Sequence, residues 1–110
     1  MKSPAECHSM QDLRAQIDLL DAQIVAAIAA RAGYIDRAIV LKQAEGLPAR
    51  IEDRVEEVVA RVRARAKVDG ADPALMEELW RRLIDWSIAR EEQVLGPDRP
   101  GEGIDDGDID

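Results

Sequence analysis

The sequence contains few aromatic residues, one cysteine and one histidine. Its 110 residues include two Trp, one Tyr and no Phe, and Cys7 and His8 are the single residues of their types. One cysteine cannot form an internal disulfide, and a neighbouring Cys and His are too small a ligand set for a metal site. We therefore expect no metal. Without phenylalanine, the core must consist of Leu, Ile, Val and Ala, which favours closely packed helices.

Long apolar runs and an excess of positive charge are also missing. No stretch approaches the roughly 18 apolar residues of a membrane span. Lys2 is followed by Pro4 and Glu6 instead of the apolar segment of a signal peptide. The net charge of −8 and the pI of about 4.6 argue against nucleic acid or an anionic membrane as a partner. These features predict a soluble, cytoplasmic protein.

The apolar residues that are present predict a long first helix, from about Met10 to Ala44. They recur at alternating intervals of four and three, the spacing of one helix face, at Leu13, Ile17, Leu20, Ile24 and Ala27. Ser9 is the expected N-cap, and we expect the helix to continue through Gly33. Such a helix is roughly 50 Å long, well beyond the diameter of a compact monomer of this size. The length therefore predicts a helical homodimer.

Two further helices follow. The second is predicted from about Arg50 to Lys67, with an apolar face that consists of Ile51, Val55, Val58, Val62 and Ala66. Asp72 and Pro73 are a typical helix start, and the third helix should end at Leu95, before Gly96. The prediction is an all-α fold of a long, a short and a medium helix, in one domain of residues 1–95. Residues 96–110 are acidic and aperiodic, which predicts a disordered tail.

Charged and polar residues interrupt the apolar faces. Arg31 and Lys42 lie on the face of the first helix that should be apolar, about three turns apart, and Ser87 and Glu91 lie one turn apart on the third. Cations on a core face require an anion beside them. Arg14 is about 25 Å from Arg31 along the helix, so it could reach such an anion only from the other chain of an antiparallel dimer.

Two guanidinium groups and an ammonium group suit a compact dianion, such as a dicarboxylate. The sequence contains no nucleophile–base pair, no cluster of metal ligands and no glycine-rich phosphate loop. An enzyme with these residues would therefore act by positioning and electrostatic stabilisation. The alternative is that the charges form ordinary surface ion pairs of a non-catalytic helical dimer, which would act as a binding module.

The order and spacing of these residues resemble the all-helical chorismate mutases over about residues 3 to 95. The matching positions are Asp12-Leu13-Arg14, Ile17-Asp18, Asp21, Arg31, Lys42, Asp53-Arg54, Ser87 and Glu91. The N-terminal Met1-Lys2-Ser3-Pro4 and Cys7 are similar to a branch of the family that includes isochorismate-pyruvate lyase. The resemblance implies an intertwined homodimer with two sites, each of which takes one arginine from the partner chain.

The resemblance also implies roles for the individual residues. Arg14 of the partner chain and Arg31 would hold the carboxylates of the substrate. Lys42 would contact a carboxylate and the ether oxygen, and Glu91 would hydrogen-bond the same ether oxygen. The remaining pocket positions would be Arg54 and Ser87. The reaction would be the pericyclic rearrangement of chorismate to prephenate or, in the lyase, the conversion of isochorismate to salicylate and pyruvate. Neither reaction requires a cofactor.

The sequence departs from the mutase pattern at two positions. Glu91 stands where bacterial members commonly have glutamine, and only a protonated acid could donate a hydrogen bond to the ether oxygen. Typical mutases have a glutamate at the position of Val55, where it binds the ring hydroxyl of the substrate. Valine removes this acceptor, which is also the case in the lyase branch. Val55 also fits the apolar face of the second helix. The sequence thus predicts chorismate mutase activity, with the lyase as the alternative and the non-catalytic dimer as a third.

Overall fold

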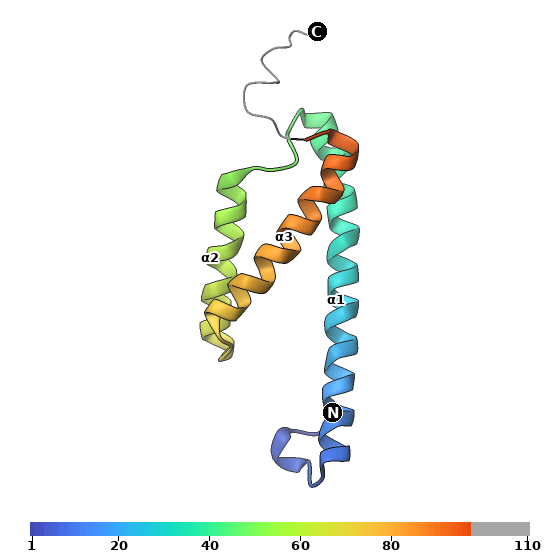
Figure 1. The fold of residues 1–110 in the computed structure, drawn as a ribbon, viewed down its shortest axis with the longest axis vertical. Coiled ribbons are helices and arrows are strands. Elements are labelled where there is room, and N and C mark those ends of the chain that lie inside the picture. The colour runs from blue at the N-terminus through green and yellow to red at the C-terminus, as the bar shows by residue number, and fades with distance from the viewer. Residues whose placement is uncertain (98–110) are drawn as a thin grey trace. The chain divides into compact units, whose positions relative to one another are not determined.

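The fold is all-helical, as predicted. A computed structural model describes residues 1–97, and these contain the short 3-10 helix η1 (Pro4–Glu6), α1 (Met10–Glu45), α2 (Glu52–Asp69) and α3 (Pro73–Leu95), with no strand among them (Figure 1). None of these helices combines the length and apolarity needed to cross a membrane. The predicted disordered tail lies, from residue 98 onward, outside the described residues.

The boundaries of α1 follow from local signals. The hydroxyl of Ser9 accepts a hydrogen bond from the backbone N–H of Asp12 at 3.0 Å, which is the expected N-cap. The helix passes through Gly33 without a break. It ends at Glu45 because Gly46 has a φ of 71°, a left-handed conformation that glycine adopts at little cost. The predicted helix was therefore correct to within one residue at its end.

The chain divides into two compact units, Met1–Tyr34 and Ile35–Asp110, and their boundary falls within α1. In the first unit, the segment before α1 folds back onto the helix. The Lys2 ammonium forms an ion pair with Asp12 at 2.8 Å, and the Lys2 backbone N–H donates to Gln16. No residue of this unit is buried. Its large apolar side chains are 41% to 54% exposed at Ile17, Leu20, Ile24 and Ile28.

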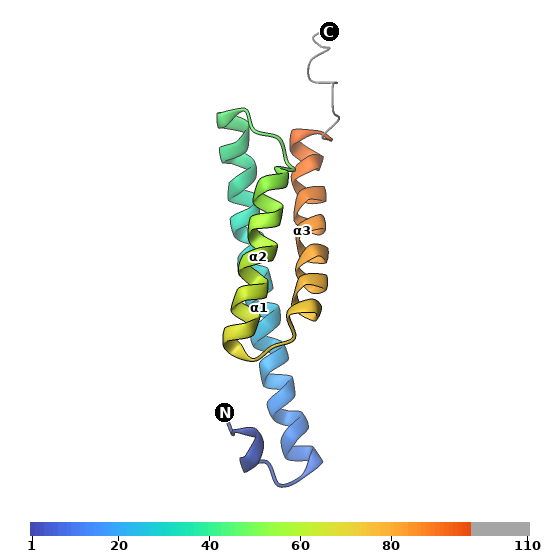
Figure 2. The same cartoon turned by 90° about the vertical axis from the view of Figure 1, so that its left-hand side faces the viewer.

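The second unit contains the hydrophobic core, which lies mainly between α2 and α3. These two helices run side by side in opposite directions and are joined by the turn after Asp69 (Figure 2). The core cluster consists of Ala49, Val55, Val59, Ile84 and Ile88. Val55 and Ala66 of the predicted α2 face are buried, but Val59 is buried more deeply than Val58. The helix begins two residues later than predicted, because Ile51 has an extended backbone.

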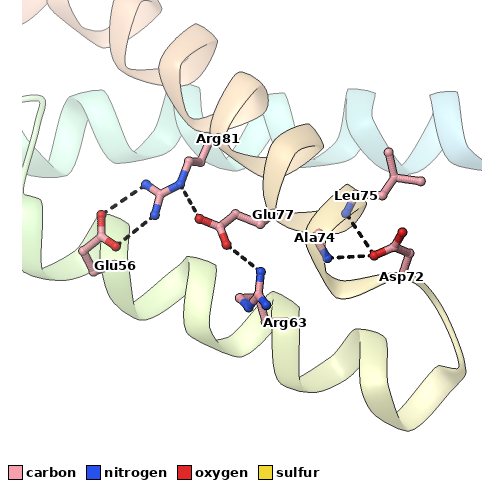
Figure 3. Close-up of polar contacts among 7 residues, drawn as sticks. All are labelled: Glu56, Arg63, Asp72, Ala74, Leu75, Glu77 and Arg81. Atoms are coloured by element: carbon pink, nitrogen blue, oxygen red, sulfur yellow. Dashed lines mark hydrogen bonds and ion pairs between the residues drawn. The ribbon is translucent and has the colours of Figure 1, made fainter.

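Capping residues fix the ends of α3 where the sequence placed them. The carboxylate of Asp72 accepts hydrogen bonds from the backbone N–H groups of Ala74 at 2.9 Å and Leu75 at 3.4 Å (Figure 3). Pro73 occupies the first turn, and Gly96, with a φ of 86°, follows the last residue, Leu95. These contacts set the ends of the helix that carries Ser87 and Glu91.

A chain of ion pairs connects α2 to α3 beside the core (Figure 3). Arg81 of α3 binds Glu56 of α2 with two hydrogen bonds, at 3.0 and 3.1 Å, and Glu77 of its own helix at 2.8 Å. Glu77 also accepts a hydrogen bond from Arg63 of α2 at 2.7 Å. Hydrogen bonds from Arg81 are the main reason why the pKa values of Glu56 and Glu77 lie below the ordinary value of 4.5.

These lowered pKa values predict a loss of stability in acid. Carboxylates whose pKa is lower in the folded chain than in the unfolded chain contribute stability above the unfolded value, and this contribution disappears as the pH falls through the folded value. We expect the thermal midpoint to fall between about pH 5 and about pH 3, and Glu77→Gln to make this fall smaller. Thermal unfolding followed by circular dichroism would measure both effects.

The control is Glu78→Gln, which removes the same charge from the exposed neighbouring residue of α3. It should keep the acid-dependent fall of the wild type. Equal pH dependence in the two variants would show that the Arg81 network does not cause the effect.

Candidate functional site

The last turn of α1, the following loop and α3 meet at the side chain of Lys42. Its ammonium donates a hydrogen bond to Oε1 of Glu91 at 2.7 Å and another to the backbone carbonyl of Ala49 at 2.6 Å. Lys42 and Glu91 are 49 residues apart in the sequence. The structure thus brings together the two residues for which catalytic roles were predicted.

The pair is largely withdrawn from solvent. The side chain of Glu91 is 5% exposed and that of Lys42 is 19% exposed. A carboxylate buried to this degree is stable in its charged form only beside a cation with good hydrogen-bond geometry, which Lys42 supplies. An ammonium has three N–H donors, and the contacts within residues 1–97 engage two of them. The third can serve a bound anion or ether oxygen.

Ser87 lies one turn before Glu91, and these are the buried polar residues among residues 1–97. They occupy the stripe of α3 that also carries the core residues Ile84 and Ile88, as the sequence pattern indicated. The Ser87 hydroxyl donates to the carbonyl of Leu83 at 2.8 Å, which satisfies its proton within the helix.

Arg90, the residue before Glu91, connects α3 to α1. Its guanidinium donates two hydrogen bonds to the carboxylate of Asp36, at 2.5 and 3.1 Å, and lies 5.4 Å from the ring centre of Trp86. The hydrogen bonds from Arg90 lower the pKa of Asp36. The sequence reasoning missed this contact, because the 54-residue separation leaves no local pattern that links the two residues.

The other predicted residues form different contacts or belong to the first unit. Arg54 of α2 is exposed and forms an ion pair with Glu57 at 2.8 Å, one turn along its own helix. Arg14 and Arg31 both belong to the first unit, where Arg14 is exposed and Arg31 is partly buried. Val55 belongs to the buried core cluster, as its place on the apolar face of α2 suggested.

The donors and acceptors around Lys42 suit binding of an uncharged or anionic oxygen rather than a metal. Among residues 1–97, no group of three or more His, Cys, Asp and Glu side chains is arranged to hold a metal ion. What the arrangement offers is a positive charge held in place by Glu91 and by a fixed carbonyl. A preoriented ammonium in a partly desolvated position stabilises negative charge that develops on a nearby oxygen.

Comparison with known proteins gives two findings. The family model described as chorismate mutase type II matches residues 13–92. The isochorismate pyruvate lyase of Pseudomonas aeruginosa is 33% identical over 92 residues, which represent 83% of this chain and 89% of that protein. Both matches include Lys42, the loop after it and most of α3.

Proposed function

The chain belongs to the chorismate mutase type II family, and we propose that it is a chorismate mutase, which rearranges chorismate to prephenate. The members of this family are enzymes, either chorismate mutases or isochorismate pyruvate lyases. Both substrates are compact dicarboxylates that contain an ether bond, and in both reactions this bond breaks without a covalent enzyme intermediate. The site therefore needs to hold two carboxylates and to stabilise charge on one oxygen.

The buried pair of Lys42 and Glu91 is the observation that carries this proposal. As the carbon–oxygen bond breaks, the ether oxygen gains negative charge. Lys42 donates its remaining N–H to that oxygen, and its position is already fixed by Glu91 and by the Ala49 carbonyl. Because these contacts exist before substrate binds, little reorganisation is needed during the reaction. Glu91, when protonated, donates a second hydrogen bond to the same oxygen.

We assign the substrate carboxylates to Arg31 and to Arg14 of a partner chain, since Arg forks bind carboxylates with two parallel hydrogen bonds. Arg54 and Ser87 complete the pocket in this proposal. It requires a homodimer, and the apolar side chains exposed on α1 in the first unit support one. A soluble protein rarely leaves a row of residues such as Ile17, Leu20 and Ile24 uncovered.

Isochorismate pyruvate lyase is the second candidate, and two observations favour it. The Pseudomonas aeruginosa relative, 33% identical, has that activity by name. In addition, Val55 lies in the core cluster, so α2 offers no carboxylate there for the ring hydroxyl of chorismate. A site without that acceptor discriminates less strongly against the isomer whose hydroxyl is attached elsewhere on the ring.

Product analysis decides between these activities. We expect the purified protein to convert chorismate to prephenate, and an Lys42→Met variant with the same helical content to lose this activity by a factor of about 100 or more. Salicylate and pyruvate formed from isochorismate, without prephenate from chorismate, would establish the lyase instead. If a confirmed dimer converts neither compound, the protein is a binding module and the enzymatic proposal is wrong.

Substitutions at residue 91 test the role of Glu91. We expect Glu91→Gln, whose amide N–H can donate to the ether oxygen, to retain activity, and Glu91→Leu, which has no donor, to lower kcat/KM by a factor of about 10 or more. The control is Glu92→Gln, which changes the next residue of α3 and should keep the wild-type kcat/KM. Wild-type activity in a folded Glu91→Leu variant would contradict this role.

Subunit mixing tests whether Arg14 acts in the partner's site. The Arg14→Ala and Lys42→Met variants should each be inactive. After the two are unfolded and refolded together, half of the dimers are heterodimers with one intact site of two, so about a quarter of the wild-type activity should return. No recovery in a mixture that contains heterodimers would place Arg14 outside the partner's site.

A further inference from the structure

The loop between α1 and α2 is held at two consecutive residues. Ala49, which is 2% exposed, packs in the hydrophobic core, and its carbonyl accepts the hydrogen bond from Lys42. Arg50, the next residue, donates to Asp85 of α3 at 3.1 Å and to Glu52 at 3.3 Å. The carbonyl of Ala49 belongs to the peptide group that joins it to Arg50. Because a peptide group is planar and rigid, whatever orients Arg50 also constrains the direction of that carbonyl.

The helix α3 therefore acts on Lys42 by two routes. Glu91 contacts the ammonium directly at 2.7 Å. Asp85, nearly two turns earlier, holds Arg50 and so acts on the peptide whose carbonyl is the second partner of the ammonium. The preceding residues Gly46, Leu47 and Pro48 are exposed, and Gly46 has no side chain to limit its conformations. The loop thus depends on Ala49 and Arg50 for its orientation.

We propose that Arg50 is a positioning residue for Lys42. Its ion pair with Asp85 keeps the peptide between Ala49 and Arg50 turned so that the carbonyl accepts from Lys42. Without the pair, the loop turns more freely, and the ammonium loses one of its two fixed partners and becomes more accessible. The catalytic consequence rests on the proposed function, but the effect on Lys42 itself does not.

The expected effect is moderate. The side chain of Arg50 is 33% exposed and that of Asp85 is 66% exposed, so water competes for the pair. Ala49 also remains packed in the core when Arg50 is changed. The loss of an ion pair of this exposure should shift the equilibrium between the held loop and the freely turning loop by a factor of about two to five. The test must therefore compare lysines within the same molecule.

The chemical reactivity of Lys42 measures its position without any need for turnover. The chain has three lysines, Lys2, Lys42 and Lys67, and the exposed Lys67 of α2 is an internal reference. The full-length protein is treated with the N-hydroxysuccinimide ester of acetic acid, and acetylation at each lysine is followed by mass spectrometry. In Arg50→Ala, we expect Lys42 to react about two to five times faster relative to Lys67 than in the wild type.

Three further variants identify the cause. Asp85→Asn should raise the relative rate at Lys42 in the same way, because it weakens the pair from the other side, and Arg50→Lys should give an intermediate value. Arg65→Ala is the matched control: it breaks the ion pair with Asp69 at 2.7 Å, which lies within α2, and should leave the ratio unchanged. Circular dichroism of each variant confirms that the helices remain folded.

The outcomes separate this proposal from the proposed function. A faster reaction at Lys42 alone supports the positioning role, even if the wild type converts neither chorismate nor isochorismate. An unchanged ratio in Arg50→Ala, or an equal acceleration at Lys42 and Lys67, overturns it. If the wild type is active, kcat in Arg50→Ala should fall by a factor similar to the rise in reactivity. An unchanged kcat in Arg50→Ala, despite a faster reaction at Lys42, would overturn the catalytic consequence of this positioning role.

Discussion

The burial of one carboxylate, that of Glu91, constrains the arrangement of the second unit. Glu91 occupies a position on α3 that the apolar pattern would give to a core residue, and it is 4% exposed. A charge in that position must have a cation within hydrogen-bond distance, since the cost of an unpaired buried charge is several kcal/mol. The last turn of α1 provides Lys42, and the loop adds the carbonyl of Ala49. Pairing of one buried group therefore holds the end of α1 and the loop after it against α3, in which Glu91 lies 49 residues farther along the sequence than Lys42.

Ion pairs supplement a small hydrophobic core. Three ion pairs each connect α3 to a different segment. Arg81 of α3 pairs with Glu56 of α2, and Arg90 of α3 pairs with Asp36 of α1. Asp85 of α3 pairs with Arg50 of the loop. Each pair is at least partly exposed, so each contributes little by itself. Together they restrict how α3 can slide or rotate against its neighbours, which matters because Glu91 must remain opposite Lys42.

The first unit, unlike the second, has no hydrophobic core of its own. It has a regular helix and a folded N-terminal segment, but none of its residues is buried. From the length of the helix, the sequence predicted that the rest of the chain cannot cover both sides of it. A homodimer in which this part of α1 packs on a second copy would supply the missing burial and, in our proposal, would bring Arg14 to the substrate.

The sequence by itself determined the helices and the family. Ser9, Gly46, Asp72 and Gly96 mark helix ends through contacts or backbone angles that involve only neighbouring residues, so these boundaries could be predicted. It also identified Lys42 and Glu91 as charges on apolar faces. Only the tertiary structure decided that these two bind each other and that a backbone carbonyl is the second partner of Lys42. It also decided that Arg50 forms its ion pair with Asp85 and that Arg90 forms its ion pair with Asp36. A carbonyl is common to every residue, and an exposed arginine has many acidic candidates, so only the packing of the chain selects among them.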